Sequence, residues 1–184
     1  MSIKTITVSM TINGAAAGPF DVPESLMMID LLHEYANLTG TRLGCGQGIC
    51  RACVVILDND NGRSEEIRTC ITGAAYFNGR KIRTVEAHAT RNEAGEVTGL
   101  STVQQKFLEN YGFQCGYCTP GFVNAATVLI ERLKREPIEA SQIETVVTDS
   151  LNDHICRCTG YVRYHQAMKE AILATPGLIK GAHT

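Results

Sequence analysis

The stretch "GCGQGICRAC", residues 44–53, brings three cysteines and three glycines together in a short segment. Its cysteines, Cys45, Cys50 and Cys53, follow the spacing C-x4-C-x2-C, and Cys70 stands further along the chain. This spacing is that of plant-type [2Fe-2S] ligation, in which four thiolates hold one cluster. The sequence therefore predicts a cluster-binding loop whose fourth ligand comes from a separate strand.

Glycines alternate with the cysteines of this loop, at Gly44, Gly46 and Gly48. Glycine lacks a side chain and accepts positive φ, so we expect the loop to turn tightly and to point backbone N–H groups at sulfur. A structural zinc site is the alternative. Zinc ligands usually come as two similar pairs with short spacers, which the C-x4-C-x2-C pattern fits poorly.

A second group of four cysteines lies in "QCGYCTPG", residues 114–121, and "ICRCTG", residues 155–160. Its members are Cys115, Cys118, Cys156 and Cys158. Cys-x-x-Cys and Cys-x-Cys are spacings typical of metal and redox chemistry. Buried cysteines that act only as small apolar side chains would not explain two close pairs. The sequence thus predicts a second iron–sulfur site.

Both pairs are predicted to stand directly before a helix, with Thr119 as one cap, Pro120 at the first helical position and a second helix from about Thr159. A helix N-terminus offers free N–H groups and a positive dipole potential. We expect two such ends to stabilise a negatively charged cluster. His154 is expected beside the site or at the surface, since four cysteines complete it.

The pattern along the chain predicts an α+β protein of two domains. Alternating residues 3–12 and "PFDVP" favour a hairpin, and residues 24–40 have the period of one amphipathic helix. Three further β-rich runs follow, in residues 51–63, 65–71 and 81–87. We expect a small α+β domain over residues 1–87.

Residues 88–100 are polar and without period, which predicts a linker. From residue 101 to 184 the pattern is helical, and four helices over this length fit a compact four-helix bundle. Capping boxes are predicted at Ser101 with Gln104 and at Ser141 with Glu144.

Composition excludes several classes of function. The chain of 184 residues is 44% hydrophobic and 20% charged with a net charge of -2, so it is globular and offers no basic surface for nucleic acid. No apolar stretch approaches the roughly 20 residues of a membrane span, so direct membrane insertion is not expected. The first residues alternate like a strand and lack a signal-peptide core, which predicts a cytoplasmic protein with reduced thiols. Export together with a partner would instead place it in the periplasm or at a membrane.

With "GCGQGICRAC", "QCGYCTPG" and "ICRCTGY" in this order, the chain resembles the small iron–sulfur subunit of the molybdenum hydroxylases, the xanthine dehydrogenase and aldehyde oxidoreductase family. The resemblance implies a β-grasp ferredoxin-like domain followed by a four-helix domain, each with one [2Fe-2S] cluster. The outer cluster would be held by Cys45, Cys50, Cys53 and Cys70, and the inner one by Cys115, Cys118, Cys156 and Cys158. By the same match Gln114 would form a hydrogen bond with the pterin, and Cys158 would be both ligand and pterin contact.

The resemblance also implies partners. A large subunit would bind the molybdopterin cofactor and oxidise an aldehyde or an N-heterocycle, with an aldehyde as the first expectation. Electrons would pass through the inner and then the outer cluster to a flavin subunit or a c-type cytochrome subunit, and this chain itself would hold no substrate. A free-standing two-cluster ferredoxin and a zinc-stabilised interaction module remain the alternatives.

Two departures from the family pattern stand out. Arg51 occupies a position that is usually glycine, and a guanidinium beside a cluster should favour the reduced form because reduction adds negative charge. Ser101 and Thr102 replace the usual His-Pro, which weakens any assignment to the xanthine-specific branch. Ser101 can still cap the helix that follows.

Overall fold

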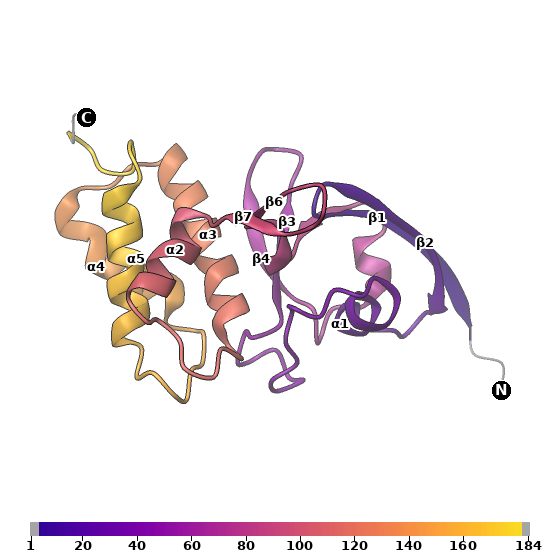
Figure 1. Ribbon diagram of the computed structural model, residues 1–184. Helices are drawn as coiled ribbons and strands as arrows, with labels where there is room; N and C mark the ends of the chain where they lie inside the picture. Colours follow the sequence, from indigo (N-terminus) through magenta and orange to yellow (C-terminus); the bar gives the residue numbers. More distant parts are fainter. Residues whose placement is uncertain (1–3, 182–184) are drawn as a thin grey trace.

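The computed structural model describes residues 4–181, and they form a β-sheet body and a helical body that lie side by side (Figure 1). The sheet contains β1 (Thr5–Ile12), β2 (Ala15–Pro23), β3 (Val54–Asp58), β4 (Ser64–Arg68) and β5 (Lys81–Arg83), in the spatial order β2-β1-β5-β3-β4. β1 and β5 run parallel, and the other neighbours are antiparallel. The protein is therefore of mixed α/β type, as predicted.

The predicted N-terminal hairpin is present. Asn13 and Gly14 connect β1 to β2 with φ values of 54° and 83°, which is the left-handed pair that a two-residue hairpin turn requires. The alternation of β1 places Val8, Met10 and Ile12 on the buried face of the sheet. This face packs against the segment that follows the hairpin.

That segment differs from the prediction of one helix over residues 24–40. The structure has a single α-turn, α1 (Met28–Asp30), followed by the π-helical turn η1 (Leu31–Tyr35). The backbone N–H of Ala36 donates to the carbonyl of Leu31 at 3.0 Å, which widens the turn and ends the helix. Leu31 and Leu32 are fully buried in the core below the sheet, whereas Tyr35 is exposed.

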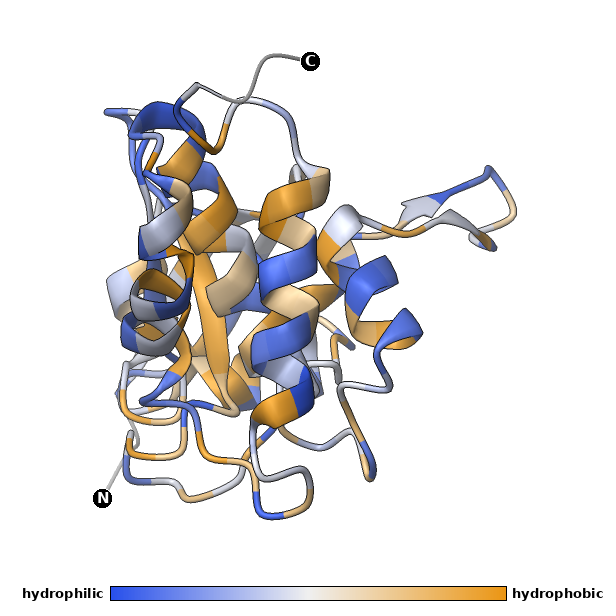
Figure 2. Ribbon diagram, turned by 90° about the vertical axis from the view of Figure 1, so that its left-hand side faces the viewer, coloured by the Kyte–Doolittle hydropathy of each residue, from blue (hydrophilic) through white to orange (hydrophobic). Residues whose placement is uncertain are grey.

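Residues 88–100 contain more structure than a linker. A 3-10 turn η3 (Val85–Ala87) precedes a two-stranded hairpin of β6 (Thr90–Arg91) and β7 (Val97–Gly99). The N–H of Asn92 donates to the carbonyl of Glu96 at 3.0 Å, and the side chain of Asn92 accepts from the N–H of Glu96 at 2.9 Å. Figure 2 shows this hairpin extending away from the body of the molecule. Local polar bonds hold it, which is why apolar periodicity did not reveal it.

Four helices follow: α2 (Thr102–Glu109), α3 (Thr119–Arg135), α4 (Ile143–Leu151) and α5 (Val162–Ala174). α5 packs against α2 and α4, and α3 packs against α2, α4 and the sheet strands β3 and β4. Phe107, Phe122, Leu129 and Met168 belong to their common core. No helix within residues 4–181 has both the length and the apolar run that a bilayer crossing requires.

The helix starts were predicted with mixed success. The capping box of Ser101 and Gln104 at α2 is confirmed. The box predicted at Ser141 and Glu144 is wrong, because Glu139 and Gln142 form it around a 3-10 turn, η4 (Ala140–Gln142). The capping box therefore begins two residues earlier than predicted, at Glu139, and Ser141 lies inside the 3-10 turn.

Candidate metal centres

The loop at residues 44–53 collects donors around one sulfur. The backbone N–H groups of Gln47 and Cys50 donate to Cys45 Sγ at 3.3 Å and 3.4 Å. These bonds, that of Cys50 first, lower the pKa of Cys45 to about 6. Gly46 and Gly48 have φ values of 66° and 71°, which is the conformation that the turn needs and that glycine adopts at no steric cost. The loop thus favours a thiolate at Cys45.

Gly44 has a different function in the same loop. A Cβ at Gly44 would lie 2.9 Å from Cys50 Sγ, closer than real Cβ atoms approach a neighbour. The absence of a side chain therefore leaves room for the sulfur.

Cys53 and Cys70 are both buried and are brought together by the pairing of two strands. Cys53 precedes β3 and Cys70 follows β4, and the register places Val54 opposite Arg68. The two thiols contact each other, and burial raises the pKa of Cys53 to about 12. Burial thus disfavours the charged thiolate of Cys53. A bound metal ion would offset this cost, because its positive charge stabilises the thiolate that coordinates it. Cys70 thus lies in the turn that follows β4, and not in a strand as the sequence predicted.

The second group is arranged in the same way. Cys115 Sγ lies 3.7 Å from Cys158 Sγ, and the side chain of Cys118 contacts that of Cys156. Cys115 and Cys158 are exposed, whereas Cys156 is buried. The hydroxyl of Thr159 donates to Cys156 Sγ at 3.1 Å. One pair therefore faces outward and one faces the helical core.

Both groups fit a two-iron cluster. Each contains two pairs of thiols in contact, and each iron of a [2Fe-2S] cluster takes two thiolates in addition to the bridging sulfides. Cys45 pairs with Cys50 and Cys53 with Cys70, while Cys115 pairs with Cys158 and Cys118 with Cys156. Among residues 4–181 no set of three or more Cys, His, Asp or Glu is placed as ligands of one single ion.

Only the first of the two predicted helix starts adjoins a cysteine. α3 begins at Thr119, but its N-cap is Cys118 rather than Thr119, and no side chain caps it. α5 begins at Val162, after Tyr161 in a left-handed conformation, and not at about Thr159. The prediction of a helix end directly after Cys158 is therefore wrong. The hydroxyl of Thr159 takes the place of a helix N–H there by donating to Cys156 Sγ, and the phenol of Tyr161 accepts from the N–H of Cys156 at 3.1 Å.

The two cysteine groups are in contact through the backbone. The N–H of Ile155, next to Cys156, donates to the carbonyl of Cys50 at 3.1 Å. Nearby, the hydroxyl of Tyr117 donates to the carbonyl of Leu43 at 2.8 Å. Cys50 of the first group is thus bonded to the residue that directly precedes Cys156 of the second group.

Arg51 lies at this contact in a conformation that suits glycine. Its φ is 58°, and its guanidinium pairs with Asp153 and lies 3.5 Å from Glu66 Oε2. His154 Nε2 is 2.9 Å from the same carboxylate, and His154 is buried rather than at the surface. Two carboxylates therefore share the charge of Arg51, which the sequence did not reveal.

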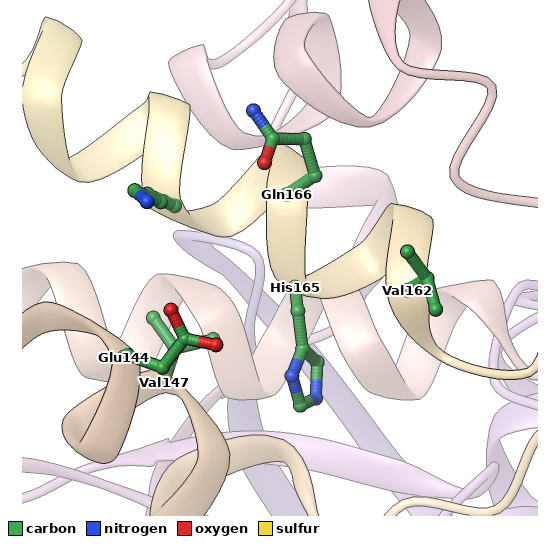
Figure 3. A pocket seen from close by; sticks show the side chains of 6 residues that line it. Glu144, Val147, Val162, His165 and Gln166 are labelled. Carbon is green, nitrogen blue, oxygen red and sulfur yellow. The ribbon is translucent and has the colours of Figure 1, made fainter.

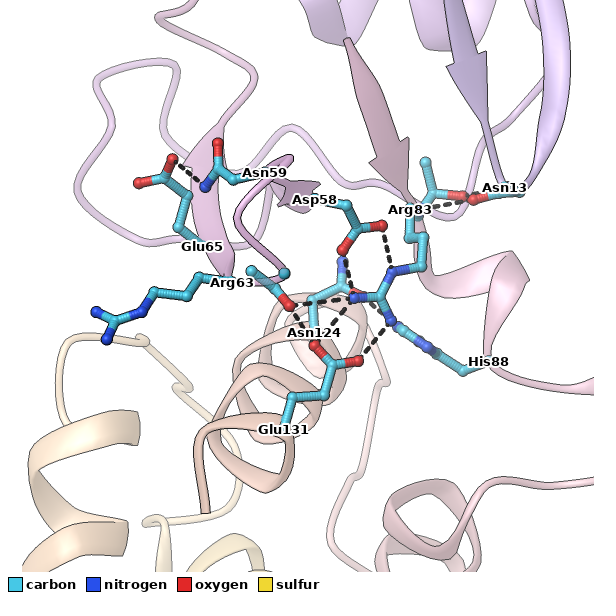
Figure 4. Close-up of polar contacts among 12 residues, drawn as sticks. Asn13, Asp58, Asn59, Arg63, Glu65, Arg83, His88, Asn124 and Glu131 are labelled. Carbon is cyan, nitrogen blue, oxygen red and sulfur yellow. Dashed lines mark hydrogen bonds and ion pairs between the residues drawn. The ribbon is translucent and has the colours of Figure 1, made fainter. Parts of the chain in front are cut away.

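A second polar network joins the sheet to α3, and Figure 4 shows it. Arg83 forms a bidentate pair with Asp58, at 2.8 Å and 2.7 Å, and a second one with Glu131 of α3, at 2.8 Å and 3.0 Å. Arg83 lowers the pKa of Glu131 in spite of its burial, and the two carboxylates raise that of Arg83. The side chain of Asn124 donates to the carbonyl of Val54 at 2.7 Å. These bonds hold the sheet and the helical body in one arrangement.

The surface around Cys115 is apolar on one side. An open groove of about 340 Å³ lies beside the loop and is lined by Leu100, Leu108, Phe113 and Pro120 among others. Gln114, the residue before Cys115, is exposed. Gln114 and Cys158 are thus both accessible at the end of the molecule where the outward pair of thiols lies.

A separate hollow of about 240 Å³ lies between α4 and α5 (Figure 3). It is lined by Glu144, Val147, Val162, His165, Gln166 and Lys169. None of the eight cysteines lines it, so it is not part of the two metal centres.

The comparisons with known proteins agree with this geometry. Residues 11–75 match the model of the 2Fe-2S iron-sulfur cluster binding domain, and residues 84–169 match the [2Fe-2S] binding domain. The chain is 37% identical to the nicotine 6-hydroxylase small subunit of Paenarthrobacter nicotinovorans, over 83% of this chain and 79% of the relative. It is 34% identical to the nicotinate dehydrogenase small FeS subunit of Eubacterium barkeri, over 92% and 97% of the two chains.

Solved structures are similar over nearly the whole chain. Quinoline 2-oxidoreductase from Pseudomonas putida 86 matches with a TM-score of 0.75 and 30% identity, over 95% of this chain and 93% of that chain. Aldehyde oxidoreductase from Desulfovibrio gigas matches with a TM-score of 0.73 and 29% identity, over 95% of this chain and 18% of that larger one.

Proposed function

The chain belongs to the family of small iron–sulfur subunits of the molybdenum hydroxylases, and we propose on that basis that it is the electron-transfer subunit of such an enzyme. It carries two [2Fe-2S] clusters, one in each of its two cluster-binding domains. Each cluster accepts and releases one electron. The chain's own residues hold the clusters, set their potentials and keep them in a fixed arrangement.

Each cluster is held by one group of cysteines, which are Cys45, Cys50, Cys53 and Cys70 for the first and Cys115, Cys118, Cys156 and Cys158 for the second. The single observation that carries this assignment is the pairing of the thiols, two by two, in both groups. The N–H donors at Cys45 Sγ and the hydroxyl donor at Cys156 Sγ add support, because hydrogen bonds to sulfur stabilise the ligated thiolate.

The partner is a large subunit that contains the molybdopterin cofactor. Its docking face includes Cys115 and Cys158, because these are the exposed thiols, and the exposed Gln114 lies beside them. In this arrangement Gln114 donates a hydrogen bond to the pterin and Cys158 is both ligand and contact. The apolar groove beside Cys115 belongs to the same face, since Gly116 lines it.

Electrons leave from the first cluster to an acceptor, a flavin subunit or a c-type cytochrome. The large subunit oxidises an aldehyde or an N-heterocycle. The names of the relatives, which include nicotine, nicotinate and quinoline enzymes, favour the N-heterocycle. The first expectation from the sequence was an aldehyde, so the class of substrate is best tested on both.

The division of the chain follows the same proposal: residues 1–87 form a ferredoxin-like β-grasp domain, residues 88–100 connect, and residues 101–184 form a four-helix bundle. Two separate hydrophobic cores support this division, one under the sheet and one among the helices. The match of the second domain model from residue 84 supports a boundary a few residues earlier.

The test is to purify the tagged chain from its native cell, identify its partners, and count iron and sulfide. We expect a large molybdopterin protein to co-purify, with about four irons and four sulfides per chain, two for each cluster. Cys70→Ser should remove the electron paramagnetic resonance (EPR) signal of one cluster and Cys156→Ser that of the other, so that each variant is the control of the other. Recovery of the chain alone with both signals would favour the free ferredoxin, and recovery with zinc and no sulfide would favour the interaction module.

A further inference from the structure

The phenol of Tyr164, in the first turn of α5, lies beside a cysteine of the second group, and the sequence did not reveal this contact. Tyr164 is fully buried, and its ring stacks on Phe122 with the ring centres 4.0 Å apart and the planes 6° from parallel. Phe107 contacts the same ring edge-on, with the ring centres 5.3 Å apart. These two aromatic contacts hold the ring of Tyr164 in place, and its hydroxyl lies beside Thr119, where α3 begins after Cys118.

The hydroxyl of Tyr164 has two partners. It lies 2.9 Å from Thr119 Oγ1 and 3.5 Å from Cys118 Sγ. A phenol has one hydrogen, so it can donate to only one of them. A cysteine that ligates a metal is a thiolate and can only accept. The arrangement that satisfies all three groups is therefore Thr119 donating to Tyr164, and Tyr164 donating to sulfur.

We propose that Tyr164, oriented by Thr119, donates a hydrogen bond to the sulfur of Cys118 and thereby raises the reduction potential of the second cluster. This inference rests on the proposed function, in which Cys118 is a ligand of that cluster. Reduction adds an electron and increases the negative charge on the ligand sulfurs, so a donor at sulfur stabilises the reduced form more than the oxidised one. Burial strengthens this effect because water does not screen or replace the bond.

The two outward thiols receive no comparable support. Cys115 and Cys158 are exposed, and among the described residues their Sγ atoms have no hydroxyl donor of this kind. The hydrogen bond from Tyr164 therefore acts on the inner pair of thiols alone. Tyr161 is the nearest comparable phenol, but its oxygen accepts from the N–H of Cys156, so it serves the backbone and not sulfur.

The experiment is a redox titration of the purified complex, with the EPR signals of both clusters followed in the same sample. Tyr164→Phe removes one oxygen and keeps the stacked ring. We expect the equilibrium between oxidised and reduced second cluster to shift about tenfold toward the oxidised form, a fall of about 59 mV for a one-electron couple. The first cluster should titrate as in the wild type and is the internal standard. Tyr76→Phe, which removes an exposed phenol in the sheet domain, is the matched control and should change neither potential.

A second measurement separates a hydrogen bond from a general structural effect. In deuterated water, pulsed EPR of the reduced second cluster should detect an exchangeable deuteron that Tyr164→Phe abolishes. Thr119→Val should lower the potential in the same direction by a smaller amount, and Thr119→Ser should restore it. An unchanged potential in Tyr164→Phe with full iron content would overturn the inference. If Tyr164→Phe loses the cluster, an unchanged potential in Thr119→Val overturns it instead. A wild-type complex without a second cluster signal would refute the proposed function itself.

Discussion

Gly121 of α3 packs tightly against the first cysteine loop, and its replacement by alanine gives a quantitative prediction. A Cβ at this position would lie 2.3 Å from the carbonyl oxygen of Arg51 and 3.3 Å from Cα of Ala52. Real Cβ atoms essentially never approach a neighbour below 3.0 Å, so the two backbones must separate by at least 0.7 Å, the difference between 3.0 and 2.3. Arg51 lies between Cys50 and Cys53, so this separation moves the first loop.

The backbone on both sides of the contact cannot move freely. The carbonyl of Cys50 accepts from Ile155, and the carbonyl of Val54 accepts from Asn124. Overpacking against fixed backbone costs about 1 to 3 kcal/mol. Alanine regains up to about 1 kcal/mol of helix propensity. From the middle of the first range and the full gain, the expected net loss is about 1 kcal/mol of unfolding free energy, which for a chain of this size lowers the melting temperature by about 2 to 4 °C.

The assay is thermal unfolding of the cluster-loaded chain at a fixed scan rate, together with EPR of the fully reduced protein. The rate is fixed because loss of clusters makes unfolding irreversible. A wider gap between the loops should also weaken the magnetic interaction between the two reduced clusters. Gly73→Ala is the matched control, because Gly73 has a φ of -65° and the nearest atom to its Cβ would be 3.8 Å away.

Gly73→Ala should leave both the melting temperature and the magnetic interaction unchanged, or stabilise the chain slightly, since alanine restricts the unfolded chain more than glycine does. If Gly121→Ala melts within 1 °C of the Gly73→Ala protein and shows the same interaction, the steric argument is refuted.

Three further predictions concern the polar contacts between the two bodies. Arg83→Met should lower the free energy of unfolding by about 2 to 3 kcal/mol in denaturant titration, because it leaves the half-buried carboxylates of Asp58 and Glu131 without their cation. Arg83→Lys, which keeps the charge, should recover only part of this free energy. Burial lowers the pKa of His88, so at mildly acidic pH the unfolded chain binds a proton that the folded chain does not. The free energy of unfolding should therefore fall as the pH drops from about 6.5 toward 5. This pH dependence should be weaker in His88→Gln. Arg51→Gly should change the melting temperature little, because relief of about 1 kcal/mol of left-handed backbone strain offsets the lost ion pairs. The same variant should lower the reduction potential of the first cluster in a redox titration.

The cysteine groups could be proposed from the sequence because their spacing is a local property of the chain. Three cysteines of the first group lie within one loop, and the chain needs only its glycines to turn there. The approach of Cys70 also followed from pattern, because β3 and β4 form neighbouring strands with a short turn. Alternation and Asn-Gly turns therefore predicted strands on either side of the first group, but not their order in the sheet.

The sequence could not reveal contacts made between distant segments. Tyr164 fits the apolar period of α5, and nothing in that period says that its hydroxyl lies against Cys118, 46 residues earlier. Gly121 was visible in "CTPG" but its partner, the carbonyl of Arg51, was not. The start of α5 was misplaced because Tyr161 adopts a φ of 71°, a conformation that propensity does not predict for tyrosine.

Domains joined by an exposed segment usually move relative to each other. Electron transfer between two clusters requires a short and constant separation, so such motion must be restricted here. Interdomain movement is the default unless the interface is extensive. Here Gly121, Asn124 and Glu131 lie on the face of α3 that contacts the first domain, and each contacts a different point of it. The same helix begins directly after Cys118, and β3, on which it packs, begins directly after Cys53. We infer that α3 fixes both cysteine groups by one rigid element, so the exposed hairpin at residues 90–99 can move without changing their separation.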